Sequence, residues 1–165
     1  MIEFVEIELN NVPDFAKLTS EIWHEYWTCI LSDEQIDYMV DKFQSETAIT
    51  NQINNEKYTY FYILYNNQKA GYIGLSDKQD YLFLSKLYIK KEFRHNGIGT
   101  EAFDFIKDFA GKNNFNKIQL TVNKYNKNTI NAYIKWGFKT IDSVVTDIGN
   151  NFVMDDYIME YKMET

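Results

Sequence analysis

The feature that most limits the fold is an apolar stretch that runs directly into a glycine-containing loop and then into a helical pattern. Residues 81–89 (YLFLSKLYI) have the composition of a buried central strand. The segment RHNGIG begins at Arg94, and from Ile98 to Lys112 apolar residues recur at helical spacing. The first N–H groups of a helix lack intrahelical partners, and glycine lets a ligand approach the backbone closely. The stretch therefore predicts an anion-binding loop, with Arg94 as a nearby cation.

Several ligands could use such a loop. A P-loop would need Gly-Lys-Ser/Thr after four intervening residues, and the chain has no such segment. A dinucleotide fold is a closer rival, because Gly97, Gly99 and Ala102 match its fingerprint. That fold requires a carboxylate at the end of the next strand, but this strand ends with residues 121–124 (TVNK), which include no acid. Only about 40 residues remain after it, too few for the further β-α-β units of that fold. A glycine turn without a ligand and a loop for coenzyme A are the other interpretations.

The rest of the chain predicts a sheet with helices on it. Helices are expected to begin near Pro13, at Ser32-Asp33 and at Asn126, in addition to the one after the glycine loop. Alternation and β-forming composition predict the other strands, at residues 2–9, 58–65, 69–75, 117–122, 138–145 and 152–162. The resulting order, β-α-α-β-β-β-α-β-α-β-β, is typical of an α+β protein with a mixed β-sheet flanked by helices. Residues 1–165 fit a single domain.

Composition argues against several classes of function. The net charge is −7, so the chain lacks the basic footprint of a nucleic-acid-binding protein and mildly favours cationic partners such as amines. No apolar run approaches the ~18 residues of a membrane span. Cys29 is the only cysteine, which excludes an intrachain disulfide and fits a reducing, cytoplasmic location. We expect no metal cofactor, no nucleic acid and no membrane, and a homodimer is compatible with the sequence.

Two stretches together resemble the GNAT superfamily of N-acetyltransferases. The pyrophosphate loop of that family reads Arg/Gln-x-x-Gly-x-Gly/Ala just after a strand, as Arg94 to Gly99 do here. Its next strand and helix read Leu-x-Val-x-x-x-Asn-x-x-Ala-Ile-x-x-Tyr-x-Lys-x-Gly-Phe. Residues 120–138 match every position of that pattern except Thr129, where alanine is usual. The resemblance covers the whole chain and implies the GNAT-like acyl-CoA N-acyltransferase fold.

The resemblance implies acetyl-CoA as the cosubstrate and a path for it along the chain. In the family the pantetheine arm pairs with backbone groups of the strand before the loop, and the pyrophosphate sits on the N–H groups of the loop. A side chain on the next helix touches the arm, and a tyrosine stands beside the sulfur. The corresponding cofactor-binding residues are Leu87, Tyr88, Ile89, Arg94, His95, Asn96, Gly97, Ile98, Gly99, Thr100, Asn126 and Tyr133.

The resemblance also implies the chemistry, which is attack of an amine on a thioester. Tyr133 would protonate the leaving thiolate, and backbone N–H groups near Ile89 would stabilise the oxyanion. The resemblance does not identify the general base, because many relatives place a glutamate where this chain has Phe83-Leu84-Ser85-Lys86. Ser85 could order a water in its place. Glu21 and Glu25, on the first helix, are the candidates for contacting the substrate or acting as the base.

The closing segment, residues 149–159, resembles the end of a bacterial branch that includes spermidine/spermine acetyltransferases. The expected reaction is direct transfer, in a ternary complex, from acetyl-CoA to a primary amine, with a polyamine or another small cationic amine as the acceptor. Protein N-termini, lysine side chains and aminoglycosides remain open as acceptors. A rival from another class is a non-catalytic module that binds acyl-CoA as a sensor or scaffold; the missing strand carboxylate favours it and Tyr133 speaks against it.

Overall fold

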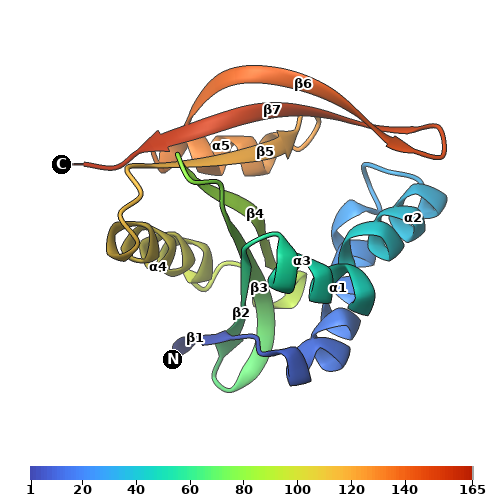
Figure 1. Cartoon of the computed structure of the whole chain (residues 1–165), viewed down its shortest axis with the longest axis horizontal. Helices are drawn as coiled ribbons and strands as arrows, with labels where there is room; N and C mark the ends of the chain where they lie inside the picture. The colour runs from blue at the N-terminus through green and yellow to red at the C-terminus, as the bar shows by residue number, and fades with distance from the viewer. Residues whose placement is uncertain (165) are drawn as a thin grey trace.

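The computed structural model describes residues 1–164 and shows a seven-stranded mixed sheet with helices on both faces (Figure 1). The strands are β1 (Ile2–Glu6), β2 (Tyr58–Tyr65), β3 (Gln68–Asp77), β4 (Leu82–Ile89), β5 (Lys117–Asn123), β6 (Lys139–Gly149) and β7 (Phe152–Lys162). The helices are α1 (Val12–Trp27), α2 (Asp33–Gln44), α3 (Glu46–Asn55), α4 (Ile98–Lys112) and α5 (Lys127–Lys135), with 3₁₀ turns η1 (Leu9–Asn11) and η2 (Lys91–Phe93). The predicted α+β class, with a mixed sheet flanked by helices, is confirmed.

The predicted element order needs one correction, because a third helix, α3, precedes β2. Its sequence, ETAITNQINN, contributes only Ile49 and Gln52 to the buried interior. A helix with so narrow an apolar stripe gives little periodic signal. Its beginning is marked by Ser45, whose hydroxyl accepts a hydrogen bond from the Ala48 N–H at 3.2 Å.

The hairpin of β2 and β3 is the one that the sequence predicts. Asn66 and Asn67 connect the strands, and both have positive φ angles, 48° and 67°. Asparagine tolerates this left-handed conformation, which gives a hairpin turn the twist of the strands that it joins.

The seven strands lie in the order β1-β2-β3-β4-β5-β7-β6. Every neighbouring pair is antiparallel except β4 and β5, which pair in parallel at only two positions, Leu82 with Ile118 and Phe83 with Gln119. Beyond Phe83 the two strands diverge, so one edge of β4 from Leu84 to Ile89 has no β5 partner. The sheet therefore opens at its centre.

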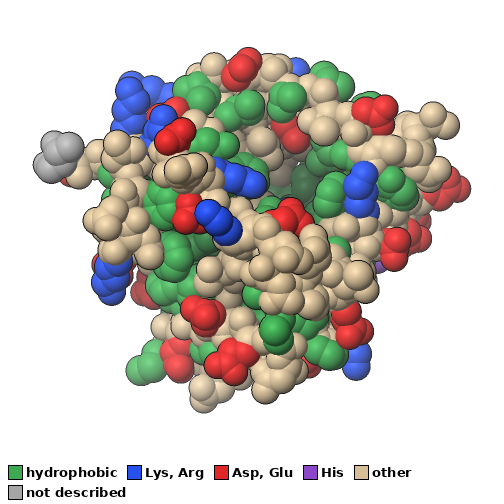
Figure 2. All heavy atoms as spheres, in the orientation of Figure 1, with side chains coloured by type: hydrophobic (Ala, Val, Ile, Leu, Met, Phe, Trp, Pro, Cys, Tyr) green, Lys and Arg blue, Asp and Glu red, His purple; other side chains and the backbone are tan. Residues whose placement is uncertain are grey.

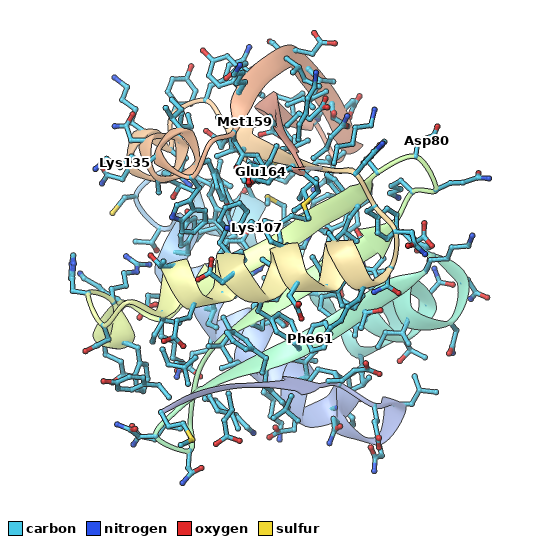
Figure 3. All side chains as sticks on the ribbon, turned by 90° about the vertical axis from the view of Figure 1, so that its left-hand side faces the viewer. Phe61, Asp80, Lys107, Lys135, Met159 and Glu164 are labelled. Carbon is cyan, nitrogen blue, oxygen red and sulfur yellow. The ribbon has the colours of Figure 1, made fainter. Side chains whose placement is uncertain are left out.

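The sheet separates two hydrophobic clusters. Alternation along β2 sends Phe61 and Ile63 toward α4, and Tyr60 and Tyr62 toward α1. The Phe61 ring packs against two rings of α4, Phe105 at 4.9 Å and Phe109 at 5.9 Å between centroids. Figure 3 looks onto α4, with Phe61 below the helix in this view and Lys107 at its upper edge. On the other face, α1, α2 and α3 cover Tyr60, Tyr62 and Tyr72.

Helix α5 ends as the sequence predicts, at Gly137. This glycine has a φ of 103°, and its N–H donates to the Ile134 carbonyl at 3.0 Å. The Phe138 N–H donates to the Tyr133 carbonyl, also at 3.0 Å. Together these two bonds form a Schellman motif, which fixes where the helix stops and where β6 begins.

The tip of the β6–β7 hairpin lies against α2 (Figure 1). The Ile148 carbonyl accepts hydrogen bonds from the Tyr38 hydroxyl, at 2.7 Å, and from the Lys42 ammonium. The Gln35 amide donates to the Val153 carbonyl at 3.2 Å. The hairpin thus bridges the two sides of the opening in the sheet. Among residues 1–164, no helix is both long and apolar enough to cross a bilayer.

Candidate active site

A cavity of about 250 Å³ lies where β4 and β5 part. Its walls come from α1, α2, β4, β5, α5 and the β6–β7 hairpin. Figure 2 shows a hollow on this face of the molecule, with hydrophobic side chains in its depth and charged side chains near its edge. Aromatic residues dominate the α1 wall, where Trp23, Tyr26 and Trp27 line it.

The predicted glycine loop lies at the end of the unpaired edge of β4. His95 and Gly97 have positive φ angles, 67° and 75°, and Gly97 is the N-cap of α4. A Cβ added at Gly97 would meet no atom within 4 Å, so the space beside this residue is open. The Asn96 amide stabilises the loop by donating to the Phe93 carbonyl at 3.0 Å. The loop is exposed at residues 94–97 and again at Thr100, whereas Ile98 is buried under it.

These features make the loop a suitable anion site. It leads into a 15-residue helix, whose first N–H groups carry the positive end of the dipole. The Arg94 guanidinium lies over the Tyr26 ring at 5.7 Å, and its Nε donates to the Ile89 carbonyl at 3.3 Å. The cation thus stands between the loop and the cavity.

The two glutamates expected to contact the substrate lie elsewhere. Glu21 forms an ion pair with Lys90 at 2.7 Å, and Glu25 accepts a hydrogen bond from the Lys91 N–H at 3.0 Å. Neither of them lines the cavity. Both connect α1 to the segment that precedes the glycine loop, which is a positioning contact rather than a contact with a substrate in the cavity.

Asn126 and Thr129 meet α1 at the start of α5. The Asn126 amide donates to the Tyr26 hydroxyl, which also shares a hydrogen bond of 2.7 Å with the Thr129 hydroxyl. Asn126 is the N-cap residue of α5 but makes no side-chain cap bond. Thr129 is the position at which the chain departs from the family pattern, and its hydroxyl supplies a contact that alanine could not make.

Tyr133 is buried and lines the cavity. Its ring packs against Trp136 and Phe138, with centroids 5.7 and 5.4 Å away. Burial raises the pKa of the Tyr133 phenol above its ordinary value, so the group stays protonated at neutral pH and can act as an acid. Tyr88 and Leu87 line the same cavity from β4, while Ile89 turns toward Gly99 on the α4 side.

Ser85 occupies a bulge in β4. The pairing of β3 with β4 jumps from Gly74–Lys86 to Leu75–Leu84, which leaves Ser85 as the extra residue. Its hydroxyl is already engaged, with the Tyr58 hydroxyl at 2.9 Å and the Lys86 ammonium at 2.9 Å.

Lys86 was not expected at the site. Its ammonium lies over the Trp23 ring at 5.6 Å and faces the cavity. Burial lowers the pKa of Lys86 to about 8, although the charge of Asp156 opposes that shift.

Asp156 is the other residue that sequence reasoning missed. It lies on β7, in register with Asn123 at the end of β5, and is 8% exposed. Its Oδ1 is buried and has no hydrogen-bond partner among residues 1–164. Burial, and then repulsion from Asp155, raises the pKa of Asp156 to about 6, against the attraction of Lys124 and Lys86. Among the described residues it is the only carboxylate that lines the cavity, and no three His, Cys, Asp or Glu side chains there gather as a metal site.

Known proteins resemble the chain over most of its length. The family model described as the acetyltransferase (GNAT) family matches residues 18–138. A spermidine N(1)-acetyltransferase from Thermoplasma acidophilum is 24% identical, over 93% of this chain and 96% of that protein. A probable N-acetyltransferase, san, from Drosophila melanogaster is 30% identical, over 86% of this chain and 70% of its own. The crystal structure of the PaiA N-acetyltransferase from Thermoplasma acidophilum, in complex with coenzyme A, has a TM-score of 0.81 at 23% identity, covering 98% of this chain and 99% of that one.

Proposed function

Because the chain belongs to the acetyltransferase (GNAT) family, we propose that residues 1–165 form one N-acetyltransferase domain that moves the acetyl group of acetyl-CoA to a small cationic amine, with polyamines as the first acceptors to test. The observation that carries the proposal is the opened sheet, in which the unpaired edge of β4 runs from the cavity to the glycine loop.

The residues at this opening fit coenzyme A. The open space at Gly97 and the helix N-terminus beside it would accommodate the pyrophosphate, with Arg94 as the counter-charge. The backbone from Leu87 to Ile89 would pair with the amide-containing arm, as an added strand pairs with a free sheet edge. That path ends at the cavity, next to Tyr133.

The chemistry requires the amine nitrogen to attack the thioester carbonyl carbon, after which the C–S bond breaks. Backbone N–H groups of β4 would stabilise the negative oxygen, at a loss of roughly 3 kcal/mol for each donor removed. The protonated Tyr133 would supply a proton to the departing thiolate, a contribution typically worth about 10²–10⁴ in rate.

The cavity supports a cationic acceptor with an apolar stem. Asp156 provides one buried negative charge, and the aromatic side chains of α1 suit both methylene groups and ammonium groups. Lys86 faces the same cavity, so only the reacting ammonium group of a polyamine would lie at Asp156, and its other ammonium groups would lie outside the cavity. The relative named as a spermidine N(1)-acetyltransferase, and the net charge of −7, favour polyamines among such amines.

The test is acetylation by the purified chain, followed as thiol release from acetyl-CoA. The panel would hold spermidine, spermine, simple alkyl amines, and peptides with a free N-terminus or a lysine. Turnover of a polyamine above the peptides is the expected result. Binding of coenzyme A without turnover of any amine would overturn the proposal and favour an acyl-CoA sensor.

A further inference from the structure

An unpaired charged group in the cavity calls for an explanation. Asp156 is more than nine-tenths buried, and its Oδ1 has no hydrogen-bond partner in the part of the chain that the structure describes. Buried polar atoms are almost always bonded, since an unpaired one costs most of its hydration energy. Neither Lys86 nor Lys124 forms an ion pair with it within 4 Å among residues 1–164. A donor from outside the chain would satisfy this oxygen.

The position of Asp156 indicates what that donor is. The residue faces Asn123, at the end of β5, and stands across the opening from β4. Asp156, Tyr88 and Tyr133 all line the cavity, which places these groups around one volume. The unpaired edge of β4, along which the thioester would lie, borders the same volume.

We propose that Asp156 is a catalytic residue that binds the ammonium group of the acceptor through Oδ1 and removes its proton. This assignment rests on the proposed function and adds the base that is absent from β4. Asp156 reaches the site from the far side of the cavity, on a strand about 70 residues further along the chain. No residue near the glycine loop is needed for the task.

The protons balance with this base. An acceptor R–NH₃⁺ must lose two protons to become R–NH–COCH₃. The first passes to the Asp156 carboxylate before attack and then to solvent. The second leaves nitrogen as the C–N bond forms and the C–S bond breaks, and Tyr133 relays it to the thiolate, so that Tyr133 ends protonated and coenzyme A leaves as the free thiol.

The charges around Asp156 support the role. Asp155 on β7, Lys124 after β5 and Lys86 on β4 are the charged groups that act on it, and Tyr88 on β4 lines the same cavity. Burial holds the pKa of Asp156 at about 6 rather than the usual 3.8, which raises its proton affinity about a hundredfold while leaving it ionised at neutral pH. Lys86 disfavours a second cation in the cavity and so helps the bound ammonium to lose its proton.

The experiment compares Asp156→Asn with Asp155→Asn, using an amine that the wild-type chain acetylates. Asp155 is the matched control, because it is the adjacent carboxylate but pairs with Lys124 at 2.8 Å and does not line the cavity. We expect kcat/KM to fall about 10²–10⁴-fold in Asp156→Asn and to stay within about twofold of wild type in Asp155→Asn. Both variants should keep the wild-type melting temperature rise with coenzyme A. A loss below about threefold in Asp156→Asn would overturn the proposal.

A second acceptor separates a base from a packing residue. A fluorinated analogue of the same amine is neutral at pH 7 and needs no deprotonation before attack. Asp156→Asn should therefore lose at least tenfold less activity on the analogue than on the parent amine. An equal loss on both amines, with or without a changed response to coenzyme A, would overturn the role as base.

The pH dependence of kcat/KM provides an independent test of Asp156 as the base. Wild-type kcat/KM should rise as pH increases through about 6, because the ionised carboxylate is the active form, and this limb should vanish in Asp156→Asn. Lys86→Met removes a nearby cation, so the limb should move to higher pH. If the wild-type chain acetylated no amine at all, the proposed function would fail together with this assignment, an outcome distinct from a loss confined to Asp156→Asn.

Discussion

At the scale of single residues, Gly97 is where backbone conformation and expected ligand contact coincide. Its φ of 75° is one that residues with a Cβ adopt at a cost of about 1–2 kcal/mol. No neighbouring atom would obstruct a methyl group there, so the protein's own packing does not require glycine. The positive φ requires it, and so would a pyrophosphate that approaches the backbone through the open space.

Gly97→Ala should therefore lower the free energy of unfolding by about 1–2 kcal/mol and weaken coenzyme A binding at least tenfold. Gly111→Ala, in the last turn of the same helix, is the matched control. Gly111 has ordinary helical geometry, and its substitution should raise the free energy of unfolding by about 0.5–1 kcal/mol without affecting binding. Urea denaturation and titration calorimetry measure both quantities. Equal binding by the two variants would contradict the place given to the pyrophosphate.

The loop residues and Tyr133 could be predicted because each belongs to a local pattern. Asp156 could not be predicted in that way. It has an identical neighbour, Asp155, and successive residues of a strand point to opposite faces. Only the register of β7 against β5 decides which of the two carboxylates enters the cavity. Glu21 and Glu25 lie on α1 as predicted, but helical spacing did not show that their side chains would contact Lys90 and Lys91 instead of lining the cavity.

At the scale of elements, strongly patterned segments were predictable and weakly patterned ones were not. The apolar strand β4, the helix α4 and the glycine stop of α5 carry their signals in adjacent residues. Helix α3 is rich in asparagine and buries few of its side chains. Its formation therefore depends on packing against α1, α2 and β2 rather than on a pattern in its own sequence. The contact of the hairpin tip with α2 depends on two long strands of matching length, which no local pattern specifies.

That contact has a testable role. The double variant Tyr38→Phe, Lys42→Met removes both donors to the Ile148 carbonyl and keeps the Tyr38 ring against Phe152. Because Ile148 lines the cavity, we expect the KM for the amine to rise about threefold to tenfold, from the loss of two hydrogen bonds. The KM for acetyl-CoA should not change. Steady-state kinetics measure both values.

The control for this variant is Lys107→Met, on α4 (Figure 3). Lys107 pairs with Asp104 at 3.3 Å and lies far from the hairpin tip in the chain and on the opposite face of the sheet. It should leave both KM values unchanged. An unchanged KM for the amine in the double variant would show that the hairpin tip does not shape the acceptor side of the cavity.

At the scale of the whole molecule, coenzyme A should act as a structural ligand. A ligand at 100 times its dissociation constant stabilises the native state by about 2.7 kcal/mol. For a chain of this length, that corresponds to a rise of about 5–11 °C in Tm. Differential scanning calorimetry with coenzyme A and with NAD measures it, and NAD should give no comparable rise. A rise with NAD alone would favour the dinucleotide interpretation of the glycine loop.

Only two residue pairs join β4 to β5, so backbone pairing in the sheet is weakest at its centre. Coenzyme A bound between β4 and β5 would contact both strands and so add interactions between the N-terminal and C-terminal halves of the sheet. Without its cosubstrate the protein would then be least stable at the site where the reaction occurs. Binding of acetyl-CoA would stabilise this region, and release of coenzyme A would remove that stabilisation in every catalytic cycle.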